Sequence, residues 1–283
     1  MREVPVLHAP NPNRCAVRYD PGRSNRTGEE PGTEHSAVKE RRFWEVDAAR
    51  GVAIVMMVVY HLTYDLDTFG GYGIESTSGF WARFADATAS AFLFLVGISL
   101  AISYSRAGAR RGLFGKYLRR GLRILAYGMA LTAVFLVLGM GIVAFGILHL
   151  IGVSIILAYP LLKYRFANLF LGVSIIAVGW YMRAQEVSSE SPWLLPLGVV
   201  PTNLPMPDYR PLLPWFGMVL LGLFVGNVLY GGGRRPAGVP RNAPLVARPL
   251  VPLGRNSLFI YLIHQPILIA LLAAFGVIEI GVL

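Results

Sequence analysis

Charged residues are scarce in this sequence. They make up 15% of its 283 residues, whereas soluble domains carry roughly 25%. Apolar residues account for 54% of the chain, and the mean hydropathy is +0.53. This composition excludes an ordinary soluble domain and predicts an integral membrane protein.

Cysteine is nearly absent as well. The single cysteine, Cys15, excludes a disulfide within the chain. No cysteines or histidines have the spacing of a zinc site. The sequence therefore gives no reason to expect a metal.

The first 40 residues lack any apolar period and are rich in proline, glycine, arginine and glutamate. Such segments do not bury enough apolar surface to fold alone. A signal peptide has an apolar core, which this stretch lacks. We therefore predict a disordered cytosolic tail over residues 1–40 and a transmembrane domain over residues 41–283.

Seven apolar segments are long enough to cross a hydrocarbon core of about 30 Å. Backbone N–H and C=O groups in lipid need partners within the protein, so these segments should be helices. The expected fold is an all-α, polytopic transmembrane bundle. Its spans should cover residues 47–66, 86–104, 122–138, 142–162, 168–182, 212–230 and 257–278.

Basic residues indicate how this bundle is oriented. The net charge is +10, but the 26 Lys and Arg residues are concentrated in the tail and in alternate loops. The other loops hold only Arg83, Arg183 and Arg210. Because cytoplasmic loops carry the basic excess, we expect the N-terminus inside and the C-terminus outside a plasma (inner) membrane. The lipid bilayer, rather than nucleic acid, explains the positive charge.

Glycine and proline mark special positions in and between the spans. Gly217, Gly222 and Gly226 should let the sixth span approach its neighbours closely. Pro266 should kink the seventh span, because proline lacks a backbone N–H. Residues 232–255 are dense in both residue types and are predicted to form a flexible cytosolic linker.

Two ionisable residues follow the apolar run of the first span. At 1.5 Å per residue, His61 lies about 16 Å along the helix from Arg50, in the outer half of the membrane. Asp65 is four residues further, so the two side chains share one helix face. Ionisable groups inside a membrane are costly and usually belong to a site. An imidazole beside a carboxylate is typical of proton abstraction.

Two further titratable residues should lie at a similar depth. His149 is about 12 Å from the turn at Gly141, and Asp86 opens the second span from the outer side. With His61 and Asp65 they predict a catalytic site below the outer face.

The alternative interpretation of these residues is structural. Asp65 would then be a solvated residue near a helix end, and His61 and His149 would hydrogen-bond to neighbouring helices. For His264, beside the kink expected at Pro266, the structural role is favoured.

The inner end of the first span carries Asp47 and Arg50. Their spacing predicts an ion pair that anchors the helix. A second interpretation is that Arg50 and the basic loop over residues 105–123 attract a polyanion such as a nucleotide phosphate. The orientation rule explains the loop without any ligand, so this alternative stays open.

Five segments resemble, in this order, the family that contains the catalytic domain of heparan-α-glucosaminide N-acetyltransferase and its prokaryotic relatives. They read FWEVDAARGVAIVMMVVYHLTYDL, FADATASAFLFLVGISLAI, FGILHLIGVS, DYRPLLPWFGMVLLGLFVG and GRNSLFIYLIHQPIL. The likeness runs from about residue 42 to the end of the chain. The last segment is also similar to the end of other integral-membrane acyltransferases.

The resemblance implies acyl transfer across the membrane. Acyl-CoA, as acetyl-CoA, would bind from the cytosol, and its acyl group would pass to a glycan or another small-molecule amphiphile outside. The CoA phosphates would be held by Arg50, Arg119, Arg120 and Arg123. The glycines of the second and sixth spans would make room for the pantetheine arm.

In this family Arg50 and Gly51 match the start of the first helix, and Asp86, Gly97 and Ser99 match the second. If His61 takes over the catalytic task in this chain, it would, steered by Asp65 or Asp86, either deprotonate the acceptor or briefly carry the acyl group itself. Donors to the oxyanion would come from His149, Asn203 or Trp215.

The sequence departs from the family at one point. The eukaryotic lysosomal enzyme has its essential histidine in the first outer loop, whereas this chain has no histidine between residues 62 and 148. His61 instead falls where the eukaryotic helix has an asparagine. Two other functions therefore stay open: a proton-coupled transporter and a non-catalytic membrane scaffold. The sequence also leaves open a homo-oligomer.

Overall fold

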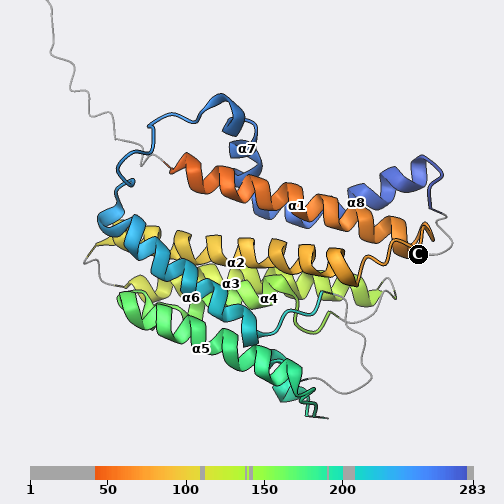
Figure 1. Cartoon of the computed structure of the whole chain (residues 1–283), viewed down its shortest axis with the longest axis horizontal. Coiled ribbons are helices and arrows are strands. Elements are labelled where there is room, and N and C mark those ends of the chain that lie inside the picture. Colours follow the sequence, from red (N-terminus) through yellow and green to blue (C-terminus); the bar gives the residue numbers. More distant parts are fainter. Residues whose placement is uncertain are drawn as a thin grey trace, which may run out of the picture. The chain divides into compact units, whose positions relative to one another are not determined.

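The computed structural model describes residues 42–108, 112–137, 139, 143–189, 191–199 and 208–278. These residues form helices joined by loops (Figure 1). The helices are α1 (Trp44–Thr68), α2 (Gly79–Ala107), α3 (Leu113–Val137), α4 (Ile147–Leu157), α5 (Arg165–Ala184), α6 (Leu212–Leu229), α7 (Leu250–Arg255) and α8 (Ser257–Ala274). Short 3-10 turns are η1 (Tyr159–Leu161), η2 (Pro192–Leu197), η3 (Gly231–Gly233) and η4 (Leu245–Ala247).

The predicted all-α membrane fold is confirmed. Among the described residues, six helices are long and apolar enough to span a membrane: α1, α2, α3, α5, α6 and α8. The described residues from Arg42 onward form one compact unit. The predicted tail over residues 1–40 lies outside the described residues.

The fourth expected span is not one long helix. Its α-helix, α4, begins at Ile147 and has only 11 residues. Gly146 before it is extended, and Pro160 in η1 follows it, where proline cannot continue the backbone ladder. The segment still runs along α3, because the Thr132 hydroxyl donates to the Val143 carbonyl and the rings of Tyr117 and Tyr159 are 5.8 Å apart.

The α2/α6 contact forms the centre of the bundle. A Cβ added to Gly97 would lie 2.1 Å from the Val219 carbonyl oxygen, and one added to Gly222 would lie 2.0 Å from the Phe94 carbonyl oxygen. The expectation of close helix approach is therefore confirmed. The expectation that these glycines make room for a pantetheine arm is wrong, because each faces the backbone of the other helix.

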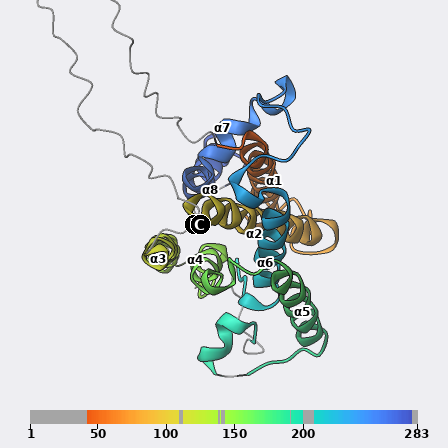
Figure 2. The same cartoon turned by 90° about the vertical axis from the view of Figure 1, so that its left-hand side faces the viewer.

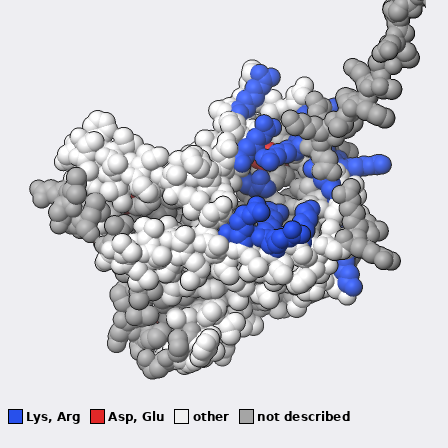
Figure 3. Space-filling model, turned by 180° about the vertical axis from the view of Figure 1, so that it is seen from behind, with Lys and Arg blue, Asp and Glu red and all other residues white. Residues whose placement is uncertain are grey.

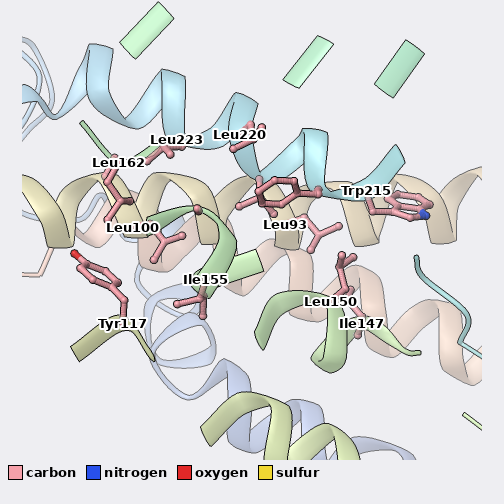
Figure 4. Close-up of a cluster of buried hydrophobic side chains, with 14 of the residues drawn as sticks. Leu93, Leu100, Tyr117, Ile147, Leu150, Ile155, Leu162, Trp215, Leu220 and Leu223 are labelled. Carbon is pink, nitrogen blue, oxygen red and sulfur yellow. The ribbon is translucent and has the colours of Figure 1, made fainter. Parts of the chain in front are cut away.

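Large apolar side chains fill the space between α2, α4 and α6. Leu93, Leu150, Leu220 and Leu223 are inaccessible to solvent (Figure 4). Helix α5 packs beside α6, and α3 beside α4 (Figure 2). Most residues of α3, α5 and α8 are not buried within the chain, as expected for helices that face lipid.

The loop after α6 ends in a docked helix. Within residues 232–255, predicted as a flexible linker, α7 packs against α1. A Cβ on Gly51 would lie 2.1 Å from the Leu250 carbonyl oxygen, and one on Gly254 would lie 1.7 Å from the Asp47 carbonyl oxygen. The sequence signal of glycine and proline thus marks close packing here and not only flexibility. Helix α8 follows and continues through Pro266.

Candidate functional site

One end of the bundle is basic. Lysine and arginine side chains gather there around a hollow (Figure 3). The start of α1 contributes Arg50, whose Nη1 lies 3.1 Å from Asp47 Oδ1 and whose Nη2 donates to the Ser99 hydroxyl of α2. The Asp47 side chain is 5% exposed, and its second carboxylate oxygen lies 3.5 Å from Arg255 Nε at the end of α7.

The four arginines expected to hold phosphates are placed differently. Arg120 of α3 lies within electrostatic range of Arg50, so the structure brings these two cations together. Arg119 is exposed and donates to the Gly115 carbonyl of its own helix. Arg123 is exposed on α3 as well. Arg255 was not predicted as a phosphate-binding residue, but its ion pair with Asp47 places it beside Arg50.

His61 lies next to a second histidine. Its ring centroid is 4.7 Å from that of His264 in α8, and the two rings meet edge to face at 67°. His61 Nδ1 is buried and has no hydrogen-bond partner among the described residues. His264, interpreted from sequence as structural, is thus a neighbour of the predicted base.

Asp65 is fully buried near the end of α1. Its Oδ1 accepts a hydrogen bond of 2.5 Å from Nε2 of Gln265 in α8. Its Oδ2 has no partner within the described part of the chain. The carboxylate therefore pairs with an amide of another helix, and not with His61 as the four-residue spacing predicted, because α8 packs against this face of α1.

His149 occupies the first turn of α4. Its Nδ1 accepts a hydrogen bond of 3.2 Å from the Gly146 backbone N–H, so in the neutral ring Nε2 carries the hydrogen. This Nε2 is buried without a partner among the described residues. Gly128 of α3 leaves room for the ring, since a Cβ there would lie 3.1 Å from His149 Cε1.

Asp86 is engaged in an ion pair. Its Oδ1 accepts from Nη1 of Arg210, which precedes α6. The Arg210 guanidinium also lies over the Trp215 ring, 4.7 Å from its centroid. The backbone N–H of Arg210 donates to the Phe145 carbonyl at 2.9 Å. From the sequence Arg210 was expected only as a loop residue. Its position in the segment DYRPLLPW, directly before α6, is the sequence feature that indicates its role. Asn203, an expected oxyanion donor, lies outside the described residues.

The residues before α6 contact both the start of α4 and helix α8. Asp208 Oδ2 accepts from the Ile147 N–H at 3.3 Å and from the Tyr261 hydroxyl at 3.4 Å. The Tyr261 ring lies 5.7 Å from that of His264. The neighbouring Tyr209 hydroxyl donates to the Leu195 carbonyl, and burial raises the pKa of this hydroxyl to about 12.

The structure therefore separates the predicted site into neighbouring clusters. His61 and Asp65 meet His264 and Gln265 at the α1/α8 contact, whereas His149 lies in the first turn of α4. Asp86 does not open the second span as expected, because α2 begins at Gly79 and Asp86 lies about two turns inside the helix. Tyr261, Asp208 and Arg210 connect the clusters, and sequence reasoning missed all three. Within the described ranges, no three His, Cys, Asp or Glu residues are placed to hold a metal ion.

The clusters described above lie within a segment that matches a known protein family. Residues 42–266 match the family model described as heparan-alpha-glucosaminide N-acetyltransferase, catalytic. The chain belongs to this family. The match reaches from the start of α1 through Gln265, so it includes both sides of the α1/α8 contact. No curated protein and no solved structure matches the chain.

Membership in the heparan-α-glucosaminide N-acetyltransferase catalytic family agrees with the fold. Six apolar helices of spanning length make this a multi-pass integral membrane protein. The catalytic family indicates a membrane acetyltransferase.

Proposed function

We propose that this chain transfers an acetyl group from cytosolic acetyl-CoA to a hydroxyl or amino group of a glycan or small amphiphile on the other side of the membrane. One observation carries the proposal. Within a catalytic family domain, α1 connects a basic end at Arg50 to a buried polar cluster at His61 and Asp65. The distance along the helix from Arg50 to His61 is about 16 Å.

The basic end supplies the donor site. A CoA carries several phosphate charges, and arginine binds phosphate in a planar, two-pronged geometry. Arg50 is held in place by Asp47 and Ser99, and Arg120 lies within its electrostatic range. These two residues would form the centre of the phosphate site, with Arg119 and Arg123 adding positive charge at its edge.

The buried cluster supplies the chemistry. The acceptor oxygen or nitrogen attacks the thioester carbonyl carbon while His61 takes its proton. The C–S bond then breaks, the new C–O or C–N bond remains, and the proton passes to the CoA thiolate. If His61 itself attacks first, the acetyl group rests on the ring nitrogen before the acceptor removes it.

Three other residues would support this reaction. The negative charge of Asp65 stabilises the protonated imidazole of His61, although the hydrogen bond that Asp65 accepts comes from Gln265. The free Nε2–H of His149 is a donor for the developing oxyanion. Asp86 fixes Arg210 and thereby the segment that leads into α6.

We also propose the setting of this reaction. The basic end faces the cytosol, because basic loops stay inside, and the membrane is the plasma (inner) membrane. The partners are the lipid bilayer and the acceptor, with no nucleic acid. A homo-oligomer is compatible with the exposed faces of α3, α5 and α8.

The test uses purified protein in liposomes with radiolabelled acetyl-CoA. D-glucosamine serves as the first acceptor probe, because the family description names a glucosaminide. We expect label on the amino sugar, and we expect His61→Ala to abolish it while His35→Ala in the amino-terminal tail leaves it unchanged.

Other results would favour the other functions. Transfer retained in His61→Ala removes this histidine from the mechanism. Uptake of D-glucosamine into the liposomes without consumption of acetyl-CoA identifies a transporter. Neither transfer nor uptake, over a panel of acceptors, supports a scaffold.

A further inference from the structure

The contact between α1 and α8 buries an unusual set of polar atoms. Helix α1 contributes His61 and Asp65, and α8 contributes His264 and Gln265. Asp65 is 0% and His264 is 8% exposed. One polar atom of each of the four side chains is buried and has no hydrogen-bond partner among the described residues: His61 Nδ1, Asp65 Oδ2, His264 Nε2 and Gln265 Oε1.

The hydrogen bonds that are present determine what three of these atoms can do. His264 Nδ1 lies 2.7 Å from the Tyr261 carbonyl oxygen. A carbonyl only accepts, so Nδ1 carries the hydrogen and the neutral ring has a lone pair at Nε2. Gln265 donates through Nε2 to the Asp65 carboxylate, so its free atom is the carbonyl oxygen.

Asp65 Oδ2, His264 Nε2 and Gln265 Oε1 are therefore all hydrogen-bond acceptors. Buried acceptors without donors cost free energy, and native structures rarely leave several together unless a bound group or water supplies hydrogens. A phosphate or a thioester carbonyl is itself an acceptor and does not satisfy them. The chemistry of this contact fits a group rich in N–H or O–H hydrogens, such as an amine or a sugar hydroxyl.

We infer that His264 and Gln265 of α8, together with Asp65 of α1, bind the N–H and O–H groups of the acceptor molecule beside His61. The inference rests on the proposed function and adds α8 to it. His61 provides the base, and α8 provides two of the three atoms that hold the nucleophile. The donor is bound elsewhere, at the arginines of the basic end.

The first test removes the amide of Gln265. Gln265→Leu eliminates the free acceptor, and Gln185→Leu at the exposed end of α5 is the same substitution far from the contact. Initial rates are measured against D-glucosamine at saturating acetyl-CoA, and against acetyl-CoA at saturating D-glucosamine. We expect Gln265→Leu to raise KM for the amino sugar at least about tenfold, the factor that corresponds to one lost strong hydrogen bond. KM for acetyl-CoA should change less than about twofold.

The second test uses the two nitrogens of His264. In His264→Asn the amide can replace the Nδ1–H donor but has no atom at the Nε2 position, whereas His264→Gln reaches that position. We expect the asparagine variant to raise KM for D-glucosamine and the glutamine variant to restore most of it. Equal KM values in the two variants, or equal changes for both substrates, would overturn the inference and leave these residues with a packing role.

Binding separates this inference from the proposed function. If the unaltered protein transfers no acetyl group, the proposed function fails, and the site is tested by thermal unfolding with millimolar D-glucosamine. Stabilisation of the unaltered protein and of Gln185→Leu, but not of Gln265→Leu, supports the site. No stabilisation of the unaltered protein means that only water fills the contact and overturns the inference.

Discussion

The Arg255 guanidinium lies 3.5 Å from the Asp47 carboxylate, although 208 positions separate the two residues in the chain. The other oxygen of Asp47 binds Arg50. One buried carboxylate therefore positions two arginines, one from each of two helices, at the basic end. This arrangement makes Asp47 a positioning residue for the phosphate site proposed there.

Asp47→Asn should weaken the binding of acetyl-CoA. The neutral amide no longer holds both guanidinium groups, so the arginines lose their fixed geometry. We expect KM for acetyl-CoA to rise about tenfold, equivalent to about 1.4 kcal/mol, with a smaller change in KM for the acceptor. Glu45→Gln is the control, because Glu45 pairs with Arg235 at the same end. A similar rise in both variants would show a general charge effect instead of positioning.

Gly254→Ala should separate α7 from α1. The added methyl group would lie 1.7 Å from the Asp47 carbonyl oxygen, and backbone atoms do not move aside as a flexible side chain does. We expect destabilisation of about 1–3 kcal/mol or more, measured by thermal unfolding in detergent. Gly115→Ala in α3, where the nearest atom is 4.0 Å away, should be neutral or stabilising. Equal unfolding temperatures for the two variants would contradict the docked position of α7.

The ion pair between Asp86 and Arg210 should contribute modestly to stability. Their side chains are 35% and 19% exposed, so solvent screens the pair and a coupling of about 1 kcal/mol is expected. The measurement is a double-mutant cycle with Asp86→Asn, Arg210→Gln and the combined variant in denaturant unfolding. Strict additivity of the two changes would mean that the contact contributes nothing.

The proposed orientation predicts which loops react with an impermeant reagent. Replacing the single cysteine gives a background of Cys15→Ser, into which Thr77→Cys or Ala237→Cys is introduced; both positions are exposed. A membrane-impermeant maleimide applied to intact cells should label position 77 and not position 237. Labelling of both after permeabilisation is the control. The reverse pattern before permeabilisation would invert the bundle.

The sequence predicts the helices well because hydropathy alone decides where a chain crosses lipid. The fourth span was the exception. Its apolar run continues from Ile142 to Leu162, but Gly146 and Pro160 confine the α-helix to the middle of the run. Hydropathy does not depend on backbone conformation, so it does not show where glycine and proline end the helix within an apolar run.

The site was less predictable than the fold. Spacing within one helix correctly placed His61 and Asp65 on one face, but the partner of Asp65 is Gln265, 200 positions away. Such contacts depend on which helix packs against that face, and periodicity within α1 does not contain this information. The segment LIHQPIL held the signal, since it places a histidine and a glutamine next to each other in an apolar helix.

The most direct test of the central claim is transfer between two separated compartments. Sealed liposomes contain the protein in one orientation, radiolabelled acetyl-CoA at the basic end only, and D-glucosamine on the opposite side only. The account predicts labelled acetyl-glucosamine in the acceptor compartment while CoA stays on its own side, and loss of this product in His61→Ala. Product formed only when both substrates share one side would contradict transfer across the bundle.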